Sequence, residues 1–113
     1  MARFDVHRLR SGDGLVLDCQ ADLLSHLQTR FVVPLMPPEH GPERAARLNP
    51  LFNVEGVALA MYTQYAGAMQ KNELGSVITS INDHDTEILA AIDMLITGYR
   101  SRLSSSTNRK SFH

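Results

Sequence analysis

The feature that most constrains the fold of this chain is the segment 82–99, which carries a clear helical period. Its apolar residues recur at spacings of three and four, which places them in one stripe of an α-helix: Ile88, Leu89, Ile92, Leu95 and Ile96. Acidic residues fill the first turn, where the helix dipole favours negative charge, and Asn82 is a suitable N-cap. Gly98 is a natural end, because glycine enters the left-handed conformation without steric cost. This predicted helix either covers one face of a sheet or also presents its C-terminal end to another protein.

The chain before this helix consists of short apolar segments that are typical of β-strands and are separated by turn residues. The predicted strand segments are 3–9, 15–20, 30–36, the two arms of 50–65, and 74–80. Asp13-Gly14 and Glu55-Gly56 each join two of them as a hairpin. Pro34 cannot donate to a ladder, so we expect its strand to lie at a sheet edge, which a partner strand could extend, or to bend there. The pattern predicts a mainly β fold, an antiparallel sheet or small barrel, with one C-terminal α-helix.

Length and charge define the expected domain organisation. A chain of 113 residues suits one modest domain, which we expect to span 1–99, followed by a basic, serine-rich and flexible tail at 100–113. Residues 1–98 hold seven Lys and Arg against twelve Asp and Glu, whereas residues 99–113 hold four basic residues and no acidic one. The acidic body repels a phosphate backbone and suits a basic protein partner, so direct contact with nucleic acid is not expected.

The sequence carries no pattern for membrane insertion or export. No apolar run approaches the roughly 20 residues that span a bilayer, and no signal-peptide pattern opens the chain. Cys19 is the one cysteine, so no internal disulfide is expected and the reducing cytoplasm is the predicted location. Because it lies in the segment LVLDC, Cys19 is interpreted as a small buried hydrophobic residue rather than as a nucleophile.

The residues themselves indicate binding rather than catalysis. The histidines are scattered and have no ligand spacing, so no metal or other cofactor is expected: His7, His26, His40, His84 and His113. Neither a glycine-rich phosphate loop nor a nucleophile elbow is present. Leu23 and Leu24 lie beside polar residues without a clear period, which indicates either an exposed interface or burial under a loop. Tyr99 either contacts a partner or packs back on the helix.

Five short patterns follow one another at nearly constant spacing between Phe4 and Tyr99. They are FDVH at 4–7, DCQADLL at 18–24, RFVVPL at 30–35, LNPLFNV at 48–54 and AIDMLITG at 91–98. Together they resemble the CcdB family of bacterial toxins, the toxin halves of proteic toxin–antitoxin pairs. The resemblance implies an SH3-like barrel with a small extra sheet and a C-terminal helix, which forms a homodimer.

The resemblance also implies a function and two binding surfaces. Such toxins are not enzymes and have no catalytic residues; they bind the A subunit of DNA gyrase and trap the gyrase–DNA cleavage complex. The gyrase contact of the family corresponds here to Thr97, Gly98 and Tyr99. A cognate antitoxin with a disordered C-terminal segment neutralises the toxin by covering the exposed helix face and two apolar residues after the second strand. The antitoxin contacts then correspond to Leu23, Leu24, Asp85, Ile88, Asp93 and Ile96.

This sequence departs from the family pattern at the C-terminal end of the predicted helix, where the family contacts gyrase. Thr97 stands where the family has tryptophan, and the chain continues beyond Tyr99 to His113. Loss of an aromatic anchor commonly weakens binding by ~2–4 kcal/mol. Two alternatives therefore remain: a homologue that serves as a decoy or regulator, and a ribonuclease toxin of the same fold, which needs a clustered acid and base and basic residues for RNA. Whether the target is gyrase or its relative topoisomerase IV also stays open.

Overall fold

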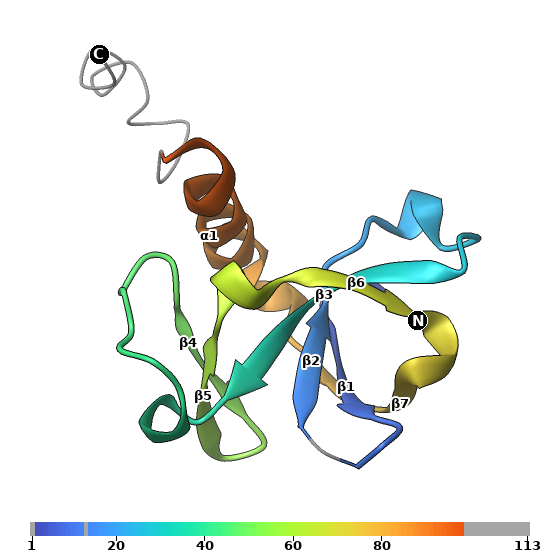
Figure 1. Ribbon diagram of the computed structural model, residues 1–113, viewed down its shortest axis with the longest axis horizontal. Helices are drawn as coiled ribbons and strands as arrows, with labels where there is room; N and C mark the ends of the chain where they lie inside the picture. The colour runs from blue at the N-terminus through green and yellow to red at the C-terminus, as the bar shows by residue number, and fades with distance from the viewer. Residues whose placement is uncertain (1, 13, 99–113) are drawn as a thin grey trace.

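The computed structural model describes residues 2–12 and 14–98, whose seven strands form one bent antiparallel sheet, an open half-barrel (Figure 1). The strand order is β4-β5-β3-β2-β1-β7, and β6 pairs with β3 beside this path. The strands are β1 Asp5–Leu9, β2 Leu15–Asp18, β3 Thr29–Met36, β4 Leu51–Val54, β5 Val57–Met61, β6 Gly67–Gln70 and β7 Leu74–Ser80. The helices are α1 Asp85–Thr97 and the short 3-10 turns η1 Asp22–Leu24, η2 Pro38–His40, η3 Thr63–Tyr65, η4 Lys71–Glu73 and η5 Asn82–His84. The mainly β prediction with one C-terminal α-helix is confirmed.

Both predicted hairpins form. Strand β1 pairs with β2, with Val6 opposite Leu17, and β4 pairs with β5, with Val54 opposite Val57. Glu55 and Gly56 join the second pair with φ angles of 53° and 86°. Positive φ at both central residues is the requirement of a two-residue hairpin turn that matches the right-handed twist of its strands.

The expected sheet edge at Pro34 is wrong, because β3 lies inside the sheet. Strand β2 pairs along one side of β3, with Val16 opposite Pro34, and the other side is shared by β6, which pairs up to Val32, and β5, which pairs from Leu35. The carbonyl of Pro34 accepts a hydrogen bond from the Tyr62 amide at 3.0 Å, so its nitrogen also faces this second side. Pro34 therefore lies at the point where the neighbour of β3 changes from β6 to β5. Because neither strand pairs with β3 at this position, the absent N–H of the proline costs no ladder hydrogen bond.

Strand β6 was not predicted, since segment 66–73 reads as a connection. Its residues, GAMQ, lack an alternating apolar pattern. They become a strand because Thr29–Val32 of β3 offer them four consecutive pairing positions. Tertiary pairing, rather than local preference, determines this element.

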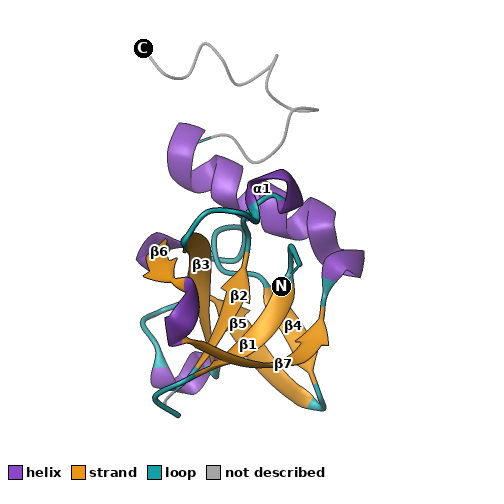
Figure 2. Ribbon diagram, turned by 90° about the vertical axis from the view of Figure 1, so that its right-hand side faces the viewer, coloured by secondary structure: helices purple, strands orange, loops and turns teal. Residues whose placement is uncertain are grey.

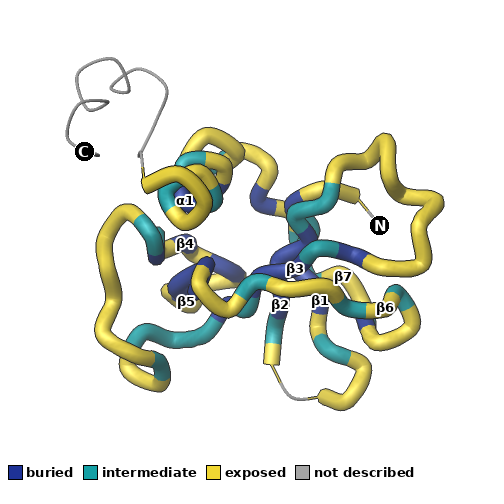
Figure 3. Tube along the Cα trace, turned by 45° about the horizontal axis from the view of Figure 1, so that its top comes forward, coloured by how far each residue is buried: buried dark blue, intermediate teal, exposed yellow. Residues whose placement is uncertain are grey.

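The core lies between the concave side of the sheet and α1 (Figure 3). Ile88 and Ala91 of α1 are completely buried against it. The buried apolar residues that the sheet and its connections contribute are Phe4, Val6, Leu17, Val33, Leu35, Phe52, Val54, Leu59, Met61 and Ile81. A smaller cluster of Val16, Val32 and Leu74 lies on the other side of the sheet.

The C-terminal helix ends as predicted but begins later. Residues Asn82–His84 form η5, and α1 follows from Asp85 without a side-chain cap bond, so the predicted N-cap role of Asn82 is wrong. Gly98 closes the helix at φ 80°, and its N–H donates to the Met94 carbonyl at 2.9 Å. Within residues 2–12 and 14–98, no helix is long and apolar enough to cross a membrane.

Candidate functional site

The outer face of α1 carries apolar side chains that no other part of the described chain covers. Asp85, Leu89, Asp93 and Ile96 are all exposed and follow one another at spacings of four, four and three. The Ile96 side chain is 73% exposed and that of Leu89 is 43% exposed. A face on which apolar and acidic groups alternate can contact an amphipathic, basic partner.

Ile88 requires a correction among the predicted antitoxin contacts. It is 0% exposed in the core, so the structure removes it from the outer face of α1. The apolar period correctly placed Ile88 on the principal stripe of the helix, but that stripe is the buried one. Leu89, one residue later, is the apolar residue that is exposed in this turn of the helix.

Leu23 and Leu24 lie on η1, at the same end of the barrel as α1 (Figures 1 and 2). Leu23 is 86% exposed and Leu24 is 42% exposed, so the alternative of burial under a loop is wrong. The end of the barrel that holds α1 and η1 is called the helix end below. Five of the six predicted antitoxin residues are thus exposed at the helix end, where α1 and η1 lie on opposite sides of the view in Figure 1.

The C-terminal tip of α1 presents a small polar surface. The Thr97 hydroxyl donates to the Asp93 carbonyl at 2.7 Å, so it is engaged within the helix. Gly98 adds no side chain, and both residues are exposed. Tyr99, the third predicted gyrase contact, lies outside the described residues, as does the predicted tail 100–113. The exposed Leu95 and Ile96 side chains supply the apolar surface nearest to this tip.

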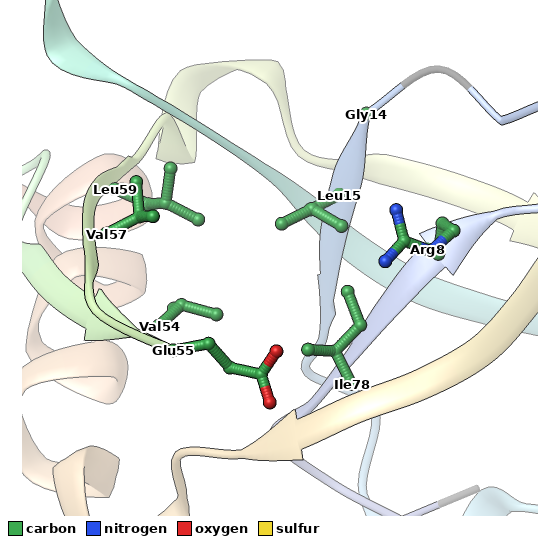
Figure 4. Close-up of a pocket in the computed structure, with 8 residues that line it drawn as sticks. All are labelled: Arg8, Gly14, Leu15, Val54, Glu55, Val57, Leu59 and Ile78. Carbon is green, nitrogen blue, oxygen red and sulfur yellow. The ribbon is translucent and has the colours of Figure 1, made fainter.

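A pocket of about 320 Å³ opens between the β4–β5 hairpin and the sheet strands β1, β2 and β7, away from the helix end (Figure 4). Aliphatic side chains form most of its wall. Arg8 of β1 and Glu55 of the hairpin turn extend into it from opposite sides. The lining residues are Arg8, Gly14, Leu15, Val54, Glu55, Val57, Leu59 and Ile78. Sequence reasoning missed this pocket, because its two walls meet only when the sheet bends.

Other reactive side chains are turned away from solvent. The Nδ1 atom of buried His7 lies 3.1 Å from the Gly75 carbonyl oxygen, and buried Arg30 is paired with Asp18. Burial, followed by the charge of Asp18, raises the pKa of Cys19 from 9.0 to about 12, which keeps it a thiol. This agrees with the interpretation of Cys19 as a hydrophobic residue. Within the described ranges, no three His, Cys, Asp or Glu side chains gather as metal ligands.

The family comparison covers nearly all of the described chain. The family model for the CcdB protein matches residues 3–98, which include both hairpins, η1 and α1. The chain belongs to the CcdB family. No curated protein matches this sequence.

Several solved structures share the fold of this CcdB-family chain. An endoribonuclease in complex with its cognate antitoxin, from a mycobacterial species, is 15% identical, with a TM-score of 0.70 over 85% of this chain and 94% of its own. A mycobacterial endoribonuclease is 14% identical, with a TM-score of 0.70 over 85% of this chain and 90% of its own. The Mycobacterium tuberculosis toxin MazF-mt6 is 14% identical, with a TM-score of 0.68 over 81% of this chain and 95% of its own.

These structures overturn one prediction. The expectation that the chain is not an enzyme is wrong as an inference from this fold, because two of the proteins that share it are endoribonucleases. The more general prediction, that the chain is the toxin of a toxin–antitoxin pair whatever its target, agrees with the family match. It also agrees with a structural neighbour that is bound to its cognate antitoxin.

Proposed function

We propose that this CcdB-family protein is a cytoplasmic, homodimeric toxin whose cognate antitoxin neutralises it by covering the helix end. The observation that carries this proposal is the pair of highly exposed apolar side chains there, Leu23 at 86% and Ile96 at 73%. Large apolar side chains left in water mark surfaces that a partner covers. The family match, which includes both residues, supports an antitoxin as that partner.

The charges of this end define the chemistry of the antitoxin segment. Asp85, Glu87 and Asp93 are exposed on α1 around Leu89 and Ile96. A disordered segment that carries alternating apolar and basic side chains complements this surface. Its charges speed association, and its apolar side chains supply most of the affinity.

The proposed target is the A subunit of DNA gyrase, bound by the exposed C-terminal tip of α1. Family membership supports this target, and Thr97 and Gly98, the positions that the sequence resemblance assigns to the gyrase contact, are exposed. Without the tryptophan, Ile96 is the side chain that offers apolar surface beside them. We therefore expect weaker gyrase binding than an aromatic anchor provides, by roughly 30- to 1,000-fold.

A second candidate function is RNA cleavage, favoured by the endoribonuclease structures and by the pocket that holds Arg8 and Glu55. The Glu55 carboxylate can take the proton of a ribose 2′-hydroxyl, whose oxygen then attacks the adjacent phosphorus while Arg8 neutralises the phosphate. The 5′-oxygen leaves with a proton from water, and Glu55 returns its proton to the resulting hydroxide. The products are a 2′,3′-cyclic phosphate and a 5′-hydroxyl.

One pair of assays on the purified protein separates these functions. Gyrase, supercoiled DNA and ATP are incubated with the protein, and protein-linked linear DNA is measured after detergent and protease treatment. Single-stranded RNA is incubated in parallel and its products are sized. DNA breaks that require gyrase support the first target, and topoisomerase IV serves as the matched second enzyme. RNA cleavage with intact DNA supports the second candidate, and antitoxin binding without either activity supports the decoy or regulator.

A further inference from the structure

We propose that Gln20 is a positioning residue that holds η1 in the conformation in which Leu23 meets the antitoxin. This inference rests on the proposed antitoxin surface and identifies what keeps that surface in shape. The turn needs such a device, because none of the residues of η1 is buried. Leu23 points its apolar side chain into solvent at 86% exposure, so hydrophobic packing does not fix the turn.

The support begins in the core with a buried ion pair. Asp18 Oδ2 accepts hydrogen bonds from Arg30 Nε at 3.0 Å and from Arg30 Nη2 at 2.7 Å, and both side chains are 0% exposed. A buried pair of this kind has a single favourable geometry, because neither charge can find water. The other oxygen of Asp18 accepts from the Gln20 backbone N–H at 3.1 Å, which fixes the chain as it leaves β2.

The Gln20 side chain then connects the sheet to the turn. Its Oε1 accepts from the Phe31 backbone N–H of β3 at 3.0 Å, just beyond the end of β2. Its Nε2 donates to the Leu24 carbonyl, the last residue of η1, at 3.0 Å. One amide therefore extends the ladder of β3 and holds the end of η1, which neither alanine nor an apolar residue can do.

Other polar contacts hold the start of the turn. The Arg3 backbone N–H donates to Asp22 Oδ1 at 2.8 Å. Within the turn, the Leu24 and Ser25 amides donate to the Ala21 and Asp22 carbonyls at 2.9 and 3.0 Å. With its start and its end both tied to the barrel, η1 is already ordered before a partner arrives, which lowers the entropy lost on binding.

The expected consequence of breaking this connection is a loss of affinity without loss of the fold. If Gln20→Ala leaves η1 in its bound shape about one-tenth of the time, the antitoxin binds about tenfold more weakly. The amides of Leu24 and Ser25 should then exchange with deuterium at close to the rate of an unprotected chain, since the turn that protects them is open about nine-tenths of the time. Gln28→Ala is the matched control, because Gln28 is exposed in the same segment and engages Lys71 through its backbone carbonyl.

The test measures two quantities. The first is the hydrogen-exchange rate of amides in the free toxin, and the second is the affinity, by titration calorimetry, for the antitoxin encoded beside the toxin gene. Gln20→Glu keeps the acceptor for Phe31 and removes the donor to Leu24, so it tests the connection even if the alanine variant unfolds. In a Leu23→Ala background, Gln20→Ala should cause little further loss, because Gln20 acts through that side chain. Unchanged exchange and affinity in both Gln20 variants would overturn the inference. Failure of the wild-type toxin to bind the antitoxin instead defeats the proposed function, and the exchange data still decide the role of Gln20.

Discussion

Asp18 and Arg30 form an ion pair that the protein encloses completely. Each side chain is 0% exposed, and Nη1 of Arg30 has no hydrogen-bond partner, so the arginine depends on Asp18 for its compensation. Both residues belong to the motifs through which the sequence resembles its family. Their identities are readable from sequence, but their pairing is not, because eleven residues separate them along the chain.

Removal of one charge from this pair tests how strongly it constrains the fold. Asp18→Asn leaves the guanidinium buried without its counter-charge, and we expect a loss of about 3–5 kcal/mol in the free energy of unfolding. Urea denaturation followed by circular dichroism measures this loss. Glu39→Gln is the control, since Glu39 is exposed on η2, and it should change stability by less than ~0.5 kcal/mol. A loss below ~1 kcal/mol for Asp18→Asn would contradict a tightly enclosed pair.

Cys19 offers a second measurement at the residue scale. Its pKa of about 12 in the folded protein, against 9.0 for an ordinary thiol, means that the folded state holds this proton more tightly. The resulting stability is present below about pH 9 and is lost as the pH rises toward 12. At pH 8 we expect iodoacetamide to alkylate the folded protein at least about 30-fold more slowly than the urea-unfolded chain, after allowance for the greater nucleophilicity of a high-pKa thiolate. Equal rates in the two states would show an accessible thiolate.

At the scale of secondary-structure elements, α1 has one side in the core and one side in solvent. Ile88 faces the core and is 0% exposed, whereas Ile96 faces solvent and is 73% exposed. The residue type is the same on both sides, so the apolar period alone does not separate a core residue from an exposed one. The sheet beneath the helix makes that distinction.

A matched pair of substitutions on α1 measures the two roles. Ile88→Ala should lower the free energy of unfolding by about 2–5 kcal/mol, because it leaves a cavity in the core. Ile96→Ala should change stability by less than ~0.5 kcal/mol and weaken antitoxin binding by about tenfold. Thermal melts and titration calorimetry provide the two readouts. Equal destabilisation by both variants would mean that Ile96 is covered within the toxin itself.

Turns and helix ends that depend on local residue chemistry were predictable from the sequence. Features that depend on which strands pair in the folded sheet were not. Glu55-Gly56 defines its hairpin because the turn needs positive φ, and Gly98 ends α1 for the same reason. Pro34 was misleading, because its effect depends on which neighbour its nitrogen faces. The Gln20 side chain beside η1 bonds the Phe31 amide of β3, a contact between segments that no local pattern contains.

At the scale of the whole molecule, the barrel separates two candidate surfaces. The helix end carries the predicted antitoxin residues, and the pocket with Arg8 and Glu55 lies away from it, between the hairpin and the sheet (Figures 1 and 4). The residues of the helix end were predicted through the family motifs, and their contact with an antitoxin stays a prediction. The pocket was not foreseen, because its walls come from strands far apart in the sequence.

Variants at the two surfaces should act independently. If the protein cleaves RNA, Glu55→Gln and Arg8→Ala should each slow cleavage by about 100-fold or more, because they remove a base and a phosphate-neutralising charge. Both should leave antitoxin affinity within about twofold, since distant sites contribute additively. Gel analysis of RNA products and calorimetry measure the two effects. Wild-type rates in both variants would remove the pocket as the site of cleavage.

The change of partner along β3 divides the barrel into two bodies joined at a seam. On one side, β2 pairs with β3 at four successive positions, and β1 and β7 follow β2 in the sheet, whereas the β4–β5 hairpin joins β3 at two ladder positions, Leu35 and Met36. A hydrogen bond from the Tyr62 amide to the Pro34 carbonyl and apolar core packing add to this attachment, and apolar contacts have no preferred direction. The pocket straddles this seam, so its width depends on the tilt of the hairpin. A repacked core would widen or narrow that opening without altering a single residue of its lining.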